Sequence, residues 1–109
     1  MSEQSNGHRA DNTEIISPIL LRKGDRIEHH GAVLEVAHII EFPCDIEGGI
    51  RVVACISRLI GNETGRIPRQ WFDTRAQLSA GGSEWAAALP EGLYWNVQGN
   101  AHASVSRIV

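Results

Sequence analysis

The segment that most restricts the fold is residues 26–42, where two β-type patterns stand on either side of a tight turn. His30 and Gly31 separate residues 26–29 from a longer run, and glycine tolerates the positive φ that short hairpin turns require. In the longer run two sets of side chains alternate, and a period of two places each set on one face of a strand. The two sets are Leu34, Val36, Ile40 and Phe42, and Glu35, Ala37, Ile39 and Glu41. The segment is therefore predicted to form a β-hairpin, with the first set facing inward.

Apolar runs elsewhere predict the remaining strands. Residues 50–60 are apolar on both faces, which is typical of a central strand. A glycine-bounded loop at 61–65 is expected to join that strand to residues 66–72 as a second hairpin. Residues 93–97 and 103–109 predict two further strands.

The first apolar stretch, residues 15–21, contains Pro18. Proline lacks the N–H that a ladder needs, so this residue is expected at a sheet edge or a strand start. Residues 22–25 follow as a turn with Gly24 in it.

Helical signals are confined to residues 74–89. Asp73 or Thr74 can cap a first short helix that ends at paired glycines, and Ser83 can cap a second that Pro90 stops. Helices of this length are marginal alone, so both must dock on the sheet through their apolar side chains. The docking residues are expected to be Leu78, Trp85 and Leu89.

The predicted fold class is mainly β, or α+β. It is a small SH3-like barrel or a strongly bent antiparallel sheet of five or six strands, with a short helical insert near 74–89. A length of 109 residues fits one domain. Residues 14–109 are predicted to form it, and the polar residues 1–13 are predicted to be a flexible tail.

Residues 20–36 contain a leucine, a basic residue, Gly24-Asp25, a short strand, Gly31 and a second strand. This pattern resembles the opening hairpin of SH3-like small barrels, and it covers 17 of the 109 residues. The compact layout also resembles accessory proteins encoded by bacteriophages and other mobile elements. The resemblance implies a protein that engages a host or viral macromolecule.

Composition restricts the surroundings and partners of the chain. It has no apolar run long enough to cross a bilayer, and its first residues lack the pattern of a secretory signal. A cytoplasmic location is therefore expected, in the host cytoplasm if the chain is phage-encoded, with no membrane partner. The net charge of −3 weighs against nucleic acid as a partner. The oligomeric state stays open, and a homodimer could form through the C-terminal strand.

Residues able to bind metal or perform nucleophilic chemistry are present, but their spacing matches no motif for either function. They are His29, His30, His38, His102, Cys44 and Cys55. Buried thiols and surface histidines account for them, so no metal, cofactor or catalytic residue is predicted. A small thiol- or metal-dependent enzyme that uses Cys44 and one of His29, His30 or His38 is kept as an alternative.

Arginine and aromatic side chains are concentrated between residues 58 and 75, and these residue types dominate binding hot spots. The predicted partner-binding residues are Arg58, Arg66, Arg69, Trp71, Phe72 and Arg75. Alternation along a strand would turn one of Trp71 and Phe72 outward and the other inward. The sequence thus predicts a small non-enzymatic binding module for a protein. The alternative partner is a nucleic-acid strand, held by arginines on its phosphates and an aromatic ring on a base.

Overall fold

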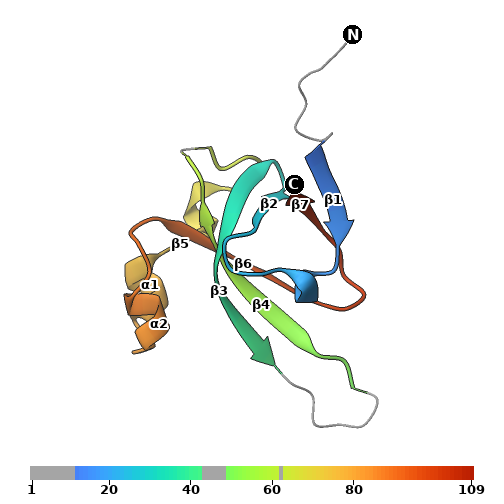
Figure 1. The fold of residues 1–109 in the computed structure, drawn as a ribbon. Helices are drawn as coiled ribbons and strands as arrows, with labels where there is room; N and C mark the ends of the chain where they lie inside the picture. The colour runs from blue at the N-terminus through green and yellow to red at the C-terminus, as the bar shows by residue number, and fades with distance from the viewer. Residues whose placement is uncertain (1–11, 43–48, 62) are drawn as a thin grey trace.

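The computed structural model describes residues 12–42, 49–61 and 63–109, and their strands form one antiparallel sheet (Figure 1). Its order is β1-β7-β2-β3-β4-β6-β5. The strands are β1 (Thr13–Ile16), β2 (Arg26–His29), β3 (Ala32–Phe42), β4 (Val52–Leu59), β5 (Asp73–Thr74), β6 (Leu93–Asn100) and β7 (Val105–Ile108). The mainly β class is confirmed. The sheet has seven strands rather than five or six, and it does not close into a barrel, because β1 and β5 remain its two edges.

The predicted hairpin is confirmed as β2 and β3. Ile27 pairs with Leu34, and His29 pairs with Ala32. At the turn His30 has φ 49° and Gly31 has φ 85°. Two consecutive positive φ values match the twist of antiparallel strands, which is why two-residue hairpins favour them.

Beyond Ala37, the side chains of β3 point to the opposite faces of the sheet from those that the sequence predicts. Its pairing with β4 passes from Val36 opposite Ser57 to His38 opposite Ile56, so Ala37 is an extra residue in a β-bulge. One extra residue inverts the alternation. Leu34 and Val36 belong to the larger apolar cluster, whereas Ile40 packs against the smaller one, so the prediction that these three residues share a face is wrong.

The central position of β4 is confirmed, because the strand is hydrogen-bonded to β3 on one side and to β6 on the other. Residues 53–57 are all buried. Val53 and Cys55 enter the larger cluster, and Ile56 enters the smaller one. Burial on both faces explains the continuous apolar run that the sequence shows here.

The second predicted hairpin is wrong. Residues 66–72 form an irregular segment that contains a 3-10 turn, η4 (Arg69–Trp71), and only β5 after it joins the sheet. Both edges of β4 are already paired, so no ladder position remains for this segment. Pro68 also lacks an N–H, and it stands directly before the turn.

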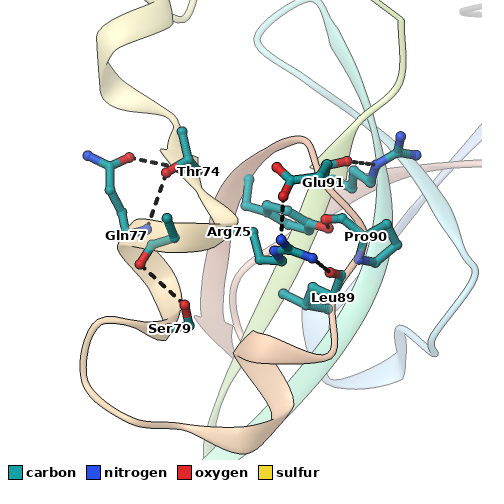
Figure 2. Close-up of polar contacts among 10 residues, drawn as sticks. Thr74, Arg75, Gln77, Ser79, Leu89, Pro90 and Glu91 are labelled. Carbon is teal, nitrogen blue, oxygen red and sulfur yellow. Dashed lines mark hydrogen bonds and ion pairs between the residues drawn. The ribbon is translucent and has the colours of Figure 1, made fainter.

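The two predicted short helices are confirmed as α1 (Arg75–Ser79) and α2 (Glu84–Ala87). Thr74 caps α1 in a reciprocal box with Gln77, which Figure 2 shows, whereas Ser83 makes no side-chain cap bond to α2. Leu78 and Trp85 pack against a cluster that contains Leu89, so all three predicted docking residues lie at the sheet.

The two ends of the described chain meet at one side of the sheet. Thr13 begins β1 opposite Ile108, and Arg107 on β7 binds the Glu14 carboxylate at 2.7 Å. Pro18 lies outside the strands, since it opens a 3-10 turn, η3 (Pro18–Leu20), and is buried. Residues 1–11 of the predicted tail lie outside the described residues. Within the described ranges, no helix has the length and apolar character needed to span a membrane.

Candidate binding surface

The irregular segment before η4 is fixed against the tip of the β2–β3 hairpin. The Arg66 backbone N–H donates to the His30 carbonyl at 2.8 Å. Gly65 has φ +62°, and a Cβ atom at this residue would lie 2.5 Å from the Gly31 carbonyl carbon. Only a residue without a side chain can approach another backbone so closely. This contact sets where the following side chains emerge.

The side chains of Trp71 and Phe72 differ in burial. The sequence predicts that one of the two faces outward and the other inward. Phe72 is 3% exposed and belongs to the larger cluster, with its ring centroid 5.8 Å from that of Trp95. Trp71 is 62% exposed, although it is among the largest apolar side chains. Phe72 is therefore an anchor in the core, and Trp71 is the residue of the pair that a partner can reach.

A hollow of about 260 Å³ lies beside Trp71, and we call it the Trp71 hollow. It is lined by His30, Arg66, Ile67, Trp71 and Trp95. The His29 ring lies close to Trp95, with the two ring centroids 5.9 Å apart. Burial, and next the charge of His30, lower the pKa of His29, so this imidazole favours its neutral form.

A smaller hollow of about 150 Å³ lies on another side of Trp71 and is lined by Trp71, Asp73, Tyr94, Trp95 and Asn96. Trp71 and Trp95 thus border two hollows of different charge. One carries Arg66 and His30, and the other carries Asp73. Polar groups of both signs therefore lie around these two aromatic side chains.

Two of the predicted arginines border a separate hollow of about 390 Å³, which we call the arginine hollow. It is lined by Arg58, Leu59, Gly61, Arg69, Gly92 and Leu93. Arg69 lies in the same turn as Trp71, so η4 contributes to both hollows. No carboxylate is among these lining residues.

Arg75 has a different role from the other predicted residues. Its guanidinium forms an ion pair with the Glu91 carboxylate and donates to the Leu89 carbonyl at 3.3 Å (Figure 2). These contacts connect the start of α1 to the turn before β6. The structure therefore places Arg75 as a link between the helical insert and the sheet.

Among the candidate thiol and metal residues in the described ranges, the rings of His29 and His30 are in contact, with their centroids 4.3 Å apart. Cys55 is fully buried, and burial raises the pKa of its thiol to about 11, which leaves it protonated and unreactive near neutral pH. His38 stacks on Trp85 with ring centroids 4.4 Å apart. Among the described residues no group of three or more His, Cys, Asp or Glu is placed to hold a metal ion. Cys44 lies outside them.

His30 and Trp95 line the surface but were not among the predicted binding residues. His30 is in the hairpin turn, and Trp95 is a half-buried residue of β6. His30 and Trp95 line the Trp71 hollow because the Arg66 N–H binds the His30 carbonyl and holds the segment before η4 against the hairpin turn. The apolar pattern of that segment does not predict this contact.

Comparisons with protein-family models, with curated proteins and with solved structures find no match for this chain.

Proposed function

We propose that the chain is a small non-enzymatic binding module whose contact surface is centred on Trp71. The observation that carries this proposal is the 62% exposure of Trp71 beside a hollow, on a turn that Phe72 anchors in the core. An exposed indole on a fixed backbone contributes a large contact area at little entropic cost. Tryptophan and arginine are the residue types most enriched among binding hot spots.

The first candidate partner is a protein. The net charge of −3 favours it over nucleic acid, and the mixed charge around Trp71 fits the varied surface of a folded partner. The resemblance to small SH3-like barrels and to phage-encoded accessory proteins suggests a host or viral macromolecule. Fold analogy does not identify function, so this suggestion depends on the experiment below.

The second candidate partner is a nucleic-acid strand, and one observation favours it. Arg58 and Arg69 share one hollow, Arg66 lines the Trp71 hollow, and neither of these two hollows has a carboxylate among its lining residues. A local concentration of positive charge can bind phosphate even when the net charge of the protein is negative.

The experiment is affinity capture from a bacterial lysate with the full chain, compared with Trp71→Ala. A matched control is Leu20→Ala, because Leu20 is also an exposed apolar residue, at 58%, but lies on η3. We expect one stoichiometric partner that Trp71→Ala loses and Leu20→Ala retains. Equal capture by both variants, or no partner at all together with no binding to nucleic acid, would refute the proposed surface.

A further inference from the structure

The arginine hollow brings together two like charges, those of Arg58 and Arg69. Arg58 comes from the end of β4 and Arg69 from η4. Neither forms an ion pair in the described ranges, and the hollow that they share has no acidic lining residue. Two guanidinium groups repel each other, so an anion between them would be stabilised by both.

Two acidic residues lie near Arg58, and neither forms an ion pair with it in the described ranges. Glu35 lies opposite Arg58 on β3 and lines a different hollow with it. The Glu91 carboxylate pairs with Arg75, as Figure 2 shows, and only the Glu91 backbone carbonyl accepts from Arg58, through Nε at 3.3 Å. Among the described residues the two Nη groups of Arg58 have no hydrogen-bond acceptor. These are the groups that form paired hydrogen bonds with oxyanions.

Arg58 is positioned before any ligand binds. Its side chain lies along Gly92, where an added Cβ would come within 2.9 Å of Nε. Together with the bond from Nε to Glu91, this contact restricts the direction of the guanidinium. A restricted arginine loses less entropy when it binds an anion, which increases the affinity.

The position of Trp71 indicates which kind of anion the surface fits. Arg69 and the exposed Trp71 lie two residues apart in one 3-10 turn, so an extended ligand that crosses this turn can contact both side chains. Single nucleic-acid strands are recognised by this combination of a cationic groove and a stacking ring. A hollow of about 390 Å³ is large enough for a phosphate group with part of its sugar, since small-molecule sites span roughly 300–1,000 Å³.

We infer that the arginine hollow binds a backbone phosphate of a single nucleic-acid strand, while a base of the same strand stacks on Trp71. This inference rests on the proposed Trp71 surface and selects its second candidate partner. Arg66, which lines the Trp71 hollow, would contact the same nucleic-acid strand.

The test titrates the full chain against a labelled single strand of about ten nucleotides and follows fluorescence anisotropy at low salt, where phosphate contacts are strongest. Arg69→Gln removes one phosphate contact, and we expect it to weaken binding about tenfold. The slope of the logarithm of the binding constant against the logarithm of the salt concentration should become shallower by about one. Trp71→Ala should weaken binding by about tenfold or more through lost stacking.

The matched control is Arg51→Gln, which changes the net charge by the same amount. Arg51 is exposed and pairs with Glu41 on another part of the sheet. We expect it to bind the strand within about twofold of the wild-type affinity. Inorganic phosphate should compete with the strand on the wild-type protein and shift the NMR signals of Arg58 and Arg69 side chains.

The outcomes separate this inference from the proposed function. Binding that depends on Trp71 but is equal in Arg69→Gln and Arg51→Gln would overturn the phosphate site and leave the Trp71 surface standing. No strand binding at low salt would overturn the inference, while lysate capture still tests a protein partner. Tighter binding of a phosphoserine peptide than of the strand would overturn it in favour of a phosphorylated protein.

Discussion

The β2–β3 hairpin and the irregular segment at 63–72 lie against each other, yet they are stabilised in different ways. The hairpin pairs its two strands in a local ladder that a two-residue turn closes. The irregular segment has no strand partner before β5, and it depends on the Arg66 bond to His30 and on buried Ile67 and Phe72. Local hydrogen bonds specify the first region, whereas tertiary contacts specify the second.

This difference locates the candidate surface. A residue in a regular strand faces one side or the other of the sheet, and the burial of each side follows from the pattern. In the irregular segment a few anchors enter the core, and the side chains between them remain outside. Trp71 and Arg69 are such side chains, which is why the binding candidates lie in the region with the least regular structure.

The largest expected effect is loss of the anchor at Phe72. Phe72→Ala should reduce the free energy of unfolding by about 3–5 kcal/mol, because it removes a buried ring and leaves a cavity. Trp71→Ala should stay within about 0.5 kcal/mol, since the ring is mostly exposed. Urea denaturation followed by circular dichroism measures both. Similar losses for the two variants would show that Trp71 is part of the core.

Gly65 tests the contact between the two regions. Gly65→Ala places a Cβ within 2.6 Å of the Ala32 nitrogen, where only backbone could move away. We expect a loss of about 3 kcal/mol or more from the unfavourable φ together with the clash.

The matched control is Gly24→Ala, because Gly24 has φ +95° but no atom within 4 Å of the added Cβ. It should cost about 1–2 kcal/mol from the φ alone. Thermal denaturation of both variants gives the comparison. Equal losses would mean that the close approach of Gly65 to the hairpin is relaxed in solution.

A smaller effect on the free energy of unfolding is expected from the titration of Cys55 on β4, in the regular part of the sheet. The pKa of Cys55 is about 11 in the folded protein against an ordinary 9.0, so the folded state retains the thiol proton more strongly. Its contribution to stability is complete below pH 9.0 and is lost as the pH rises toward 11. Cys55→Ala should lack this component.

The measurement is urea denaturation of wild type and Cys55→Ala at about pH 8 and about pH 10. The stability difference between them should decrease at the higher pH. A difference that does not change with pH would show that the thiol is accessible to water in the folded state.

The regular elements could be predicted because their signals are local. The turn at His30 and Gly31 and the capping position of Thr74 both identify structure from a few neighbouring residues. The bulge at Ala37 could not be predicted, because an extra residue in one strand becomes visible only against its partner β4. The prediction of a strand at 66–72 was wrong for a similar reason, since apolar residues fit a strand or a core anchor equally well.

The candidate surface was predicted in part. Arg58, Arg69 and Trp71 border the hollows, and Arg66 lies in the Trp71 hollow, but their use by a partner remains a prediction. Phe72 belongs to the core, and Arg75 links α1 to the turn before β6. His30 and Trp95 joined the surface through packing between distant segments.

The sequence by itself determined that the chain is mainly β, with a hairpin at residues 26–42 and two short helices, because periodicity and turn residues act over a few positions. The tertiary structure alone decided which strands became neighbours and which aromatic residue of the Trp71–Phe72 pair faces outward. Those outcomes depend on competition among distant segments for the same core and the same strand edges. The occupied edges of β4 and the approach of Gly65 to Gly31 are the contacts that settled that competition.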